Sequence, residues 1–258
     1  MRTLHAAPLV LPVGAPPVPD GAVLAEGDRL VAVGPQAELA ETYPTARIRE
    51  WPGVITPGLR QPRAGWLLRH CYFPDPREAE LLGTEPLSPA ETSRLAPDAS
   101  RMGGSVRRGL QQMLRYGTTA VAVPAGDALL GAPVARLGLR VVVAAGDAAA
   151  RAVADAPDAG AALAAPDVPG ALAALAAPDV PDALDAFGAV PDALGAVPDL
   201  DPLSGLGSLA SAVAGPLVVG GPADFAVFDA GDEGALLVRG AGTCVATVLG
   251  GRLLYRGR

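Results

Sequence analysis

The chain has 258 residues, half of them hydrophobic, and a formal net charge of −7 at pH 7. This length suits one large domain or two small ones, with a core of ordinary size. The acidic balance argues against nucleic-acid binding, which needs clustered basic residues, and we interpret the one such pair, Arg107 and Arg108, as part of a solvated helix face.

The two cysteines and the N-terminal pattern predict a soluble, cytoplasmic protein with no membrane partner. Cys71 and Cys244 lie far apart and show no C-x-x-C spacing, so we expect two buried thiols, with a disulfide as the alternative. Prolines break the apolar run at the N-terminus before a signal-peptide core could form. The uncharged run 202–223 reaches membrane-spanning length, but glycines and prolines interrupt it.

The first fifty residues predict β-structure. Two apolar runs, 21–26 and 29–34, flank Gly27-Asp28, which is typical of a β-hairpin with a tight turn. A helical turn at 37–43 and a strand at 46–50 follow.

The C-terminal end has the same character. We predict strands at 223–229, 235–239 and 244–249, with a further strand after the turn at Gly250-Gly251. Neither end has enough strands to bury both faces of a sheet alone. We therefore expect the two chain ends to pair into one β-sandwich.

The pattern changes to alternating helices and strands in the first half of the interior. Residues 100–116 have helical periodicity and stop at Gly117, and 118–123 reads as a buried strand. A short helix at 132–137 and a strand at 139–144 follow. This order predicts parallel βαβ units, so the fold class is α/β.

Residues 151–200 are dominated by Ala, Asp and Pro, and no basic residue occurs between Arg151 and Arg239. Short near-repeats such as Ala-Pro-Asp-Val-Pro recur within the segment. Two interpretations stay open, a poorly ordered linker or short helices that each stop at the next proline. Neither supplies five more strands and helices, so a barrel begun before residue 147 would be truncated.

Several motifs resemble the amidohydrolase superfamily, in its imidazolonepropionase-like branch. They are the run Trp51–Leu59, ending in Thr-Pro-Gly-Leu, and the phrase Arg-Tyr-Gly-Thr-Thr-Ala-Val at 115–121. Runs at 20–24 and 27–34 near the start, and at 221–229 and 248–252 near the end, add to the resemblance. The resemblance implies a composite β-domain built from both ends, with a partial (β/α) barrel inserted. The expected boundaries are 1–56 and 213–258 for the two halves of the composite domain, 57–147 for the barrel and 148–212 for the low-complexity segment.

In that family, His-x-His follows the Thr-Pro-Gly-Leu turn and holds a catalytic metal, with two later histidines, an aspartate and, in binuclear members, a lysine. Here Arg63 and Gly65 stand where the two histidines would be, no histidine follows His70, and the chain has no lysine. Neither an arginine side chain nor a glycine can ligate zinc. We therefore expect no metal or other cofactor, and we assign no catalytic residues.

The function expected from these observations is non-catalytic binding of a small molecule or a protein partner. The alternative is a hydrolase acting on non-peptide carbon–nitrogen bonds, with a cyclic amide, amidine or deaminase-type substrate, as the resemblance implies. Whether the chain is an enzyme stays open. An incomplete barrel would expose apolar edges, so we expect a homodimer or a bound partner protein.

The remaining chemistry-bearing residues receive structural interpretations. His70 and Cys71 are adjacent, and on the strand that we expect there they would point to opposite faces rather than form a nucleophilic pair. His5 is an even weaker candidate. The acidic stretch from Asp75 to Glu85 (Asp75, Glu78, Glu80 and Glu85) fits a helix start with Pro76 in its first turn.

Glycine pairs and isolated aromatic residues are also interpreted as structural. The pairs Gly103-Gly104 and Gly220-Gly221 lack the strand–G-x-G-x-x-G–helix context of a dinucleotide site. Asp224 and Asp229 match turns of the composite domain. Trp51 and Trp66 are single aromatics that suit a core or a pocket wall.

Overall fold

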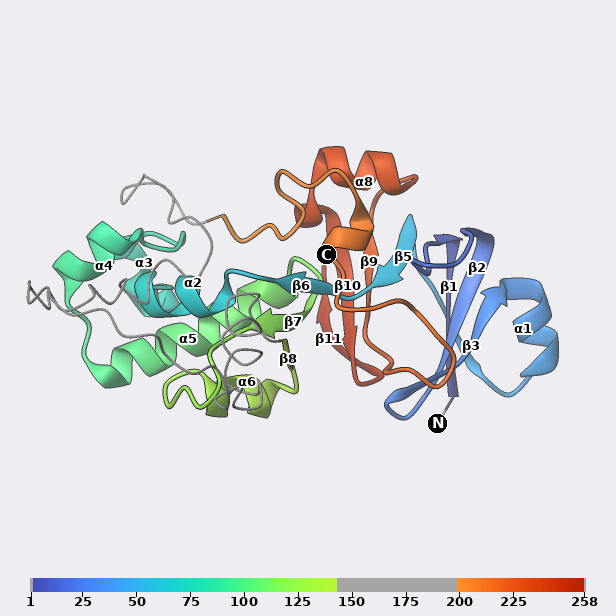
Figure 1. The fold of residues 1–258 in the computed structure, drawn as a ribbon, viewed down its shortest axis with the longest axis horizontal. Helices are drawn as coiled ribbons and strands as arrows, with labels where there is room; N and C mark the ends of the chain where they lie inside the picture. The colour runs from blue at the N-terminus through green and yellow to red at the C-terminus, as the bar shows by residue number, and fades with distance from the viewer. Residues whose placement is uncertain (1, 143–198, 258) are drawn as a thin grey trace, which may run out of the picture.

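Strands from both ends of the chain share one mixed sheet in the computed structural model, which describes residues 2–142 and 199–257 (Figure 1). Among these residues the sheet has eight strands in the order β11-β10-β9-β5-β1-β2-β3, and β4 also pairs with β1. The N-terminal members are β1 (Arg2–Val10), β2 (Val18–Glu26), β3 (Arg29–Pro35), β4 (Arg47–Glu50) and β5 (Val54–Pro57). The C-terminal members are β9 (Phe225–Phe228), β10 (Cys244–Leu249) and β11 (Arg252–Arg256).

The two ends meet where β5 and β9 pair antiparallel, with Ile55 opposite Val227. The predicted pairing of the chain ends is confirmed by this seam. The predicted hairpin is confirmed as β2 and β3, and the helical turn as α1 (Gln36–Thr42). Successive side chains of a strand point to opposite faces, and along β9 Val227 and Phe228 belong to different buried clusters. Both faces of the sheet are therefore covered at β9, where all four residues are buried.

A smaller parallel sheet follows in the order β6-β7-β8. Its strands are β6 (Leu59–Gln61), β7 (Thr118–Ala122) and β8 (Arg140–Val142), connected through α2 (Ala64–His70), α5 (Ala99–Leu114) and α6 (Gly131–Leu137). Between α2 and α5 lie a 3₁₀ turn, η1 (Pro76–Glu78), and the short helices α3 (Ala79–Leu82) and α4 (Pro89–Leu95). The predicted order of helix, strand, helix and strand between 100 and 144 is confirmed as far as residue 142, the last residue of the first described range.

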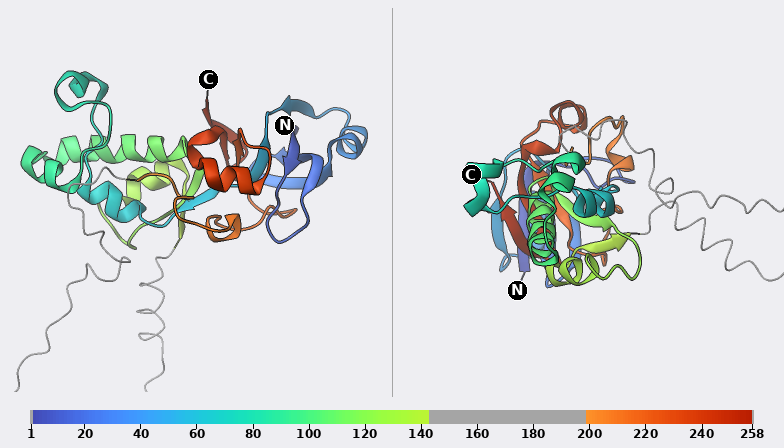
Figure 2. Two further views of the ribbon diagram at one scale, coloured as in Figure 1. Left: turned by 90° about the horizontal axis from the view of Figure 1, so that it is seen from above. Right: turned by 90° about the vertical axis from the view of Figure 1, so that its left-hand side faces the viewer.

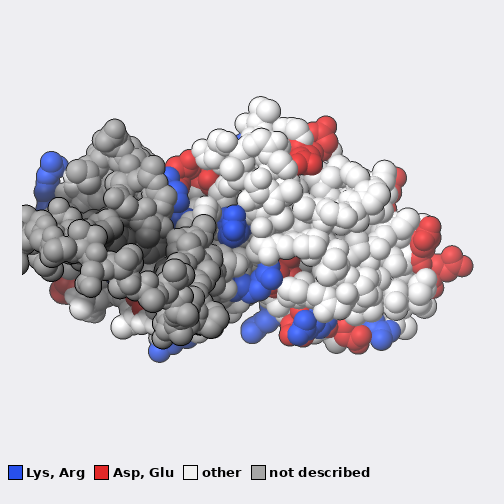
Figure 3. Space-filling view, in the orientation of Figure 1, with Lys and Arg blue, Asp and Glu red and all other residues white. Residues whose placement is uncertain are grey.

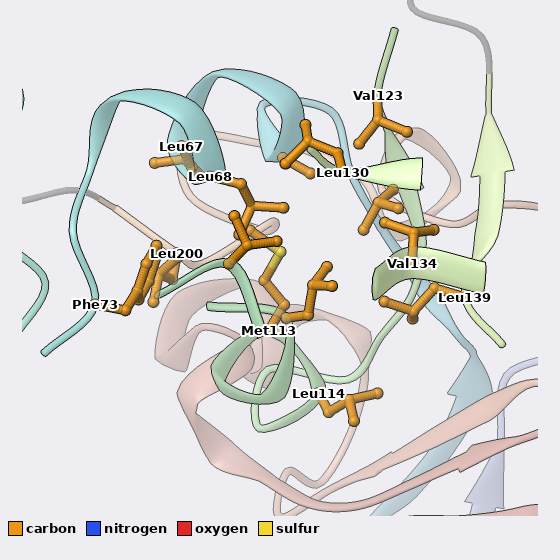
Figure 4. Close-up of a cluster of buried hydrophobic side chains, with 14 of the residues drawn as sticks. Leu67, Leu68, Phe73, Met113, Leu114, Val123, Leu130, Val134, Leu139 and Leu200 are labelled. Carbon is orange, nitrogen blue, oxygen red and sulfur yellow. The ribbon is translucent and has the colours of Figure 1, made fainter. Parts of the chain in front are cut away.

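The core of this α/β part is built by side chains from all three helices. Leu67 and Leu68 of α2, Met113 of α5 and Val134 of α6 are fully buried and converge on one another (Figure 4). Their burial removes apolar surface from water, which is the main stabilising contribution in such a core. Leu200, which lies inside the segment predicted as low-complexity, belongs to the same cluster.

The two sheets lie next to each other along the long axis of the molecule (Figures 1 and 2). Gly117, in the turn that follows the end of α5 at Leu114, adopts φ +73°, and a Cβ there would lie 2.6 Å from Phe228 Cζ. The Thr247 hydroxyl donates to the Leu114 carbonyl at 2.6 Å. Only glycine allows this approach, so the predicted helix stop also sets the contact between the two parts.

Two sequence predictions are wrong at the level of secondary structure. Residues 235–239 form most of a helix, α8 (Glu233–Arg239), rather than a strand. The Asp232 side chain caps it by accepting from the Ala235 amide at 2.8 Å, and Gly240 ends it. The segment before Cys71 is the helix α2 rather than a strand, because Ala64, Leu67 and Leu68 have the i, i+3, i+4 spacing of a buried helix face.

Further short 3₁₀ turns are η3 (Leu209–Ser211) and η4 (Ala241–Thr243). Most of the predicted low-complexity segment, residues 148–198, lies outside the described residues, and the domain boundaries stay predictions. Among the helices of the described ranges, none combines the length and the apolar character that crossing a membrane requires.

Candidate functional site

A hollow of about 240 Å³ lies at the carboxyl end of β6. In α/β folds this end of the strands is where binding residues gather. Side chains from β6 and the turn before α2 form one wall, and the returning chain at 199–212 forms the other. The residues that line it include Arg60, Gln61, Arg63, Asp199, Asp201 and Ser211.

Gln61 fixes the floor of this hollow. Its amide Nε2 donates to the Leu200 carbonyl at 3.0 Å, and its Oε1 accepts from the Arg63 backbone amide at 3.1 Å. The side chain is 2% exposed and has both ends of its amide satisfied. Gln61 therefore joins β6 to the returning chain and sets the position from which α2 starts.

Two guanidinium groups face the hollow. The Arg60 side chain donates from one terminal nitrogen to the Ser211 carbonyl at 3.4 Å, while its Nε is buried and has no partner among the described residues. Arg63 is partly buried just before α2, and its guanidinium carbon lies 5.4 Å from the centre of the Trp66 ring. A buried donor without a partner costs free energy unless a ligand or water accepts from it.

The acidic residues of the hollow are held by backbone amides. Asp201 accepts from the amides of Leu203 at 2.7 Å and Ala241 at 2.8 Å, and Asp199 accepts from the Asp201 amide. Burial raises the pKa of the Asp201 carboxyl, and these backbone hydrogen bonds oppose the rise. Both carboxylates therefore shape the returning loop.

The residues around β6 do not fit the metal that the family resemblance implies. Gly65 is buried in α2, and a Cβ there would lie 3.1 Å from Pro124 Cδ and 3.2 Å from the Ala122 carbonyl oxygen. A side chain at position 65 would therefore be crowded by the segment that follows β7. Within the described ranges, no three His, Cys, Asp or Glu side chains are grouped so that they could hold a metal ion. At position 63, where the resemblance implies a metal ligand, Arg63 has a positively charged guanidinium.

The histidines and cysteines of the sequence are not brought together as a reactive pair. His70 ends α2 and lies 5.5 Å from Trp66 between ring centres, whereas Cys71 is fully buried in the α/β core. Burial raises the pKa of the Cys71 thiol to about 12, so it stays protonated. His5 lies inside the large sheet, where its Nδ1 accepts from Trp51 Nε1 at 3.0 Å. Both cysteines are free and buried, as expected.

The acidic stretch after Cys71 is a helix cap, which confirms its structural interpretation. Asp75 and Glu78 form a capping box around η1, with Pro76 in the first turn. Glu78 also accepts from the Tyr72 hydroxyl at 2.7 Å and pairs with Arg101. The Asp75 backbone amide is the main cause of a Glu78 pKa lowered to about 2. Glu80 and Glu85 lie at exposed positions on the same segment.

The other candidates occupy structural positions. Gly103-Gly104 lies inside α5, and Gly220-Gly221 forms a turn that hydrogen-bonds with Leu30. Asp224 accepts from the Gly250 amide at 2.7 Å and pairs with Arg140, while exposed Asp229 pairs with Arg239. Trp51 belongs to the core of the large sheet, and Trp66 packs at the margin of the α/β core. Arg107 is exposed, whereas Arg108 pairs with Asp75.

Sequence reasoning missed Arg60, Gln61 and Asp201 as members of one hollow. Arg60 and Gln61 directly follow the Thr-Pro-Gly-Leu turn, and their place at the end of a parallel strand was the available signal. Asp201 lies 140 residues further along the chain, so only the folded chain reveals its proximity.

Comparison with known proteins gives one family match. Residues 21–46, which span most of β2 together with β3 and α1, match the family model described as "Imidazolonepropionase-like composite domain, bacteria". This confirms the resemblance to that branch at the segment where the hairpin was predicted. The search among curated proteins found no match.

Solved structures with a similar arrangement include ochratoxinase from A. niger, with 20% identity, a TM-score of 0.40 and coverage of 55% of this chain and 31% of that chain. Aminofutalosine deaminase from Helicobacter pylori has 16% identity, a TM-score of 0.39 and coverage of 55% and 33%. An adenosine deaminase from Xanthomonas campestris with bound zinc has 23% identity, a TM-score of 0.36 and coverage of 55% and 33%. This chain covers about a third of the length of each.

Proposed function

We propose that this chain, which carries an imidazolonepropionase-like composite domain segment at residues 21–46, is a non-catalytic protein that binds a small molecule at the carboxyl end of β6. The observation that carries the proposal is the crowding around Gly65, where a Cβ would lie 3.1 Å from Pro124. The resemblance implies metal-binding histidines at positions 63 and 65. This chain instead has a guanidinium group at Arg63 and a glycine at position 65 with little space for a side chain.

The architecture supports this reading. We infer that the large sheet corresponds to the β-sandwich of a composite domain, and that β6, β7 and β8 are the strands of a partial (β/α) barrel among the described residues. The strands run parallel and in the order expected for consecutive βαβ units. We also propose a cytoplasmic location, consistent with two free, buried thiols.

The chemistry of the hollow indicates the kind of ligand. Arg60 Nε is a buried donor without a partner in the described part, and Arg63 presents further donors at the rim. Guanidinium groups donate to oxygen acceptors in a planar, forked geometry. A ring with carbonyl oxygens or ring nitrogens suits these donors, so cyclic amides and purine bases are the probes of choice.

The binding test uses ligand-observed NMR with the full chain and with hydantoin and adenine as probes. We expect saturation transfer from the protein to at least one probe, and weaker transfer with R63Q. The control is R94Q, which makes the same change of charge at an exposed position on α4, outside the hollow. Transfer that is absent, or equally strong in all three proteins, would refute a binding site at β6.

The alternative function is hydrolysis of a non-peptide carbon–nitrogen bond, and the composite-domain match favours it. This activity would need an activating group other than the histidine pair. Turnover of hydantoin or adenine by the wild-type chain would support this alternative against the non-catalytic proposal.

A protein partner is the second form of binding that we propose. Val141 on β8 is 55% exposed, and β8 is an end strand of the parallel sheet within the described residues. An apolar end strand favours pairing with another chain. Light scattering after size-exclusion chromatography should give twice the 25.8 kDa chain mass, or the mass of a complex with a co-purified partner. A clean monomer at micromolar concentration would contradict this part of the proposal.

A further inference from the structure

A second hollow, of about 330 Å³, lies on the outer side of α5, away from β6. Four arginines and two carboxylates contribute to its lining: Arg77, Arg101, Arg107, Arg108, Asp75 and Glu78. Four guanidinium groups around one hollow are unusual in a chain that carries a net charge of −7. None of the interactions assigned to the β6 site involves this group.

Two of the four arginines are held in place by a tyrosine and two carboxylates. The guanidinium carbons of Arg101 and Arg108 lie 5.4 and 5.7 Å from the centre of the Tyr72 ring, and we call these three residues the Tyr72 clamp. Arg101 pairs with Glu78 at 2.7 Å, and Arg108 pairs with Asp75 at 3.2 Å. Arg108 also donates to the Phe73 carbonyl at 2.8 Å. Each carboxylate is thus already matched by one guanidinium with fixed orientation.

The other two arginines are not matched in this way. Arg77 and Arg107 are exposed, and neither forms an ion pair with another part of the chain that the structure describes. After the Asp75 and Glu78 pairs are subtracted, the hollow keeps an excess of two positive charges. Ser100, in the first turn of α5, adds a hydroxyl to the same lining.

We propose that this hollow binds the dianionic phosphate group of a small phosphate monoester. A doubly charged anion balances the two unmatched guanidinium groups of Arg77 and Arg107. Guanidinium forks match phosphate oxygens geometrically, and charge-assisted hydrogen bonds of this kind are stronger than neutral ones. The Tyr72 clamp holds Arg101 and Arg108 in fixed orientations before the anion arrives, so binding orders fewer side chains.

The test is isothermal titration calorimetry of the full chain with inorganic phosphate and with glycerol 3-phosphate. Sodium chloride at matched ionic strength is the blank. We expect both probes to bind, and binding to weaken as sodium chloride is raised, because the unmatched charges are solvent-exposed. R77Q and R107Q should each weaken binding on the order of fivefold, as expected for the loss of one solvated charge contact.

R94Q is the control, because it makes the same change of net charge at an exposed position on α4 that does not line the hollow. The side chains of Arg77 and Arg107 are exposed, so both variants should keep the wild-type melting temperature. Equal affinity of R77Q, R107Q and R94Q for phosphate would overturn the proposal, as would heats no larger than those of the chloride blank. Binding of inorganic phosphate but not of glycerol 3-phosphate would overturn the assignment to a monoester.

Discussion

His5 shows how burial changes the chemistry of a single side chain. It is 2% exposed in the core of the large sheet, between Trp51 and the edge of Phe225. Its Nδ1 accepts a hydrogen bond, so the neutral ring is the form that fits. Desolvation by burial, followed by the nearby charge of Arg49, lowers the pKa of His5 to about 4. The strand pairing that places Arg49 opposite His5 thus also opposes its protonation.

The first prediction concerns acid stability. A histidine in the unfolded chain has a pKa near 6.5. Between pH 4 and 6.5 the unfolded chain therefore binds a proton at His5 that the folded chain does not bind. The free energy of unfolding should therefore fall as the pH is lowered through that window, by about 3 kcal/mol at pH 4 from this residue alone. Urea unfolding at a series of pH values measures it.

Variants separate this effect from the titration of carboxylates. H5Q keeps an acceptor for Trp51 but has no titrating ring, so the part of the pH slope due to His5 should disappear. The control is H70Q, which removes a partly exposed histidine at the end of α2 and should retain most of the slope. Identical slopes for wild type and H5Q would show that His5 is not buried as described.

The second prediction tests the crowding at Gly65 against an open glycine. G65A places a methyl group 3.1 Å from Pro124 Cδ and 3.2 Å from the Ala122 carbonyl oxygen, which should destabilise the chain by about 1–3 kcal/mol through overpacking. G103A places the same methyl group on α5 with nothing within 4 Å, and should stabilise by about 0.5–1 kcal/mol through helix propensity. Thermal and urea unfolding give both signs. If G65A stabilises the chain, crowding no longer argues against a metal-binding side chain at position 65.

At residues 233–239, N-terminal capping favours a helix, α8, over the strand that the apolar run alone predicts. Leu236 is fully buried and Asp232 caps the first turn, whereas the short apolar run taken alone predicts a strand. Short apolar runs are ambiguous between helix and strand until the flanking residues are weighed. The acidic pair at 232–233 and the glycine at 240 were the signals that favoured a helix.

The third prediction follows from this cap. D232A should lower the free energy of unfolding by about 1 kcal/mol, because the Ala235 amide loses its acceptor. D229A removes an exposed carboxylate whose distance to Arg239 is 3.5 Å, and should change stability by at most about 0.5 kcal/mol. Chemical denaturation measures the free energy of unfolding of both variants. An equal loss in D232A and D229A would show that the Asp232 cap does not stabilise α8.

Local patterns predicted most elements but not the contacts between distant ones. The hairpin at 21–34 and the helix α5 could be predicted from the sequence, because turn residues and 3.6-residue periodicity are local signals. The β6 hollow was not, because Gln61 meets Leu200 across 139 residues of chain. The Tyr72 clamp was also not predicted, since it depends on how η1 packs against α5.

At the scale of the whole molecule, two sheets of different kind are joined by a few close contacts. Glycine at 117 allows Phe228 of the large sheet to pack against the end of α5, and Arg140 of β8 pairs with Asp224 at 3.4 Å. On the described part of the face shown in Figure 3, acidic and basic groups are interspersed along one margin of the large-sheet half, and its centre is uncharged.

The central proposal is that this chain, whose residues 21–46 match an imidazolonepropionase-like composite domain, binds no metal and catalyses no hydrolysis. The most direct test is elemental analysis of the full chain after incubation with zinc and dialysis, paired with turnover assays on hydantoin and adenine. We expect well under one equivalent of zinc and no turnover, because the resemblance places metal ligands at Arg63 and Gly65, and a Cβ at Gly65 would be crowded. One tightly held zinc per chain together with turnover of either compound would contradict it.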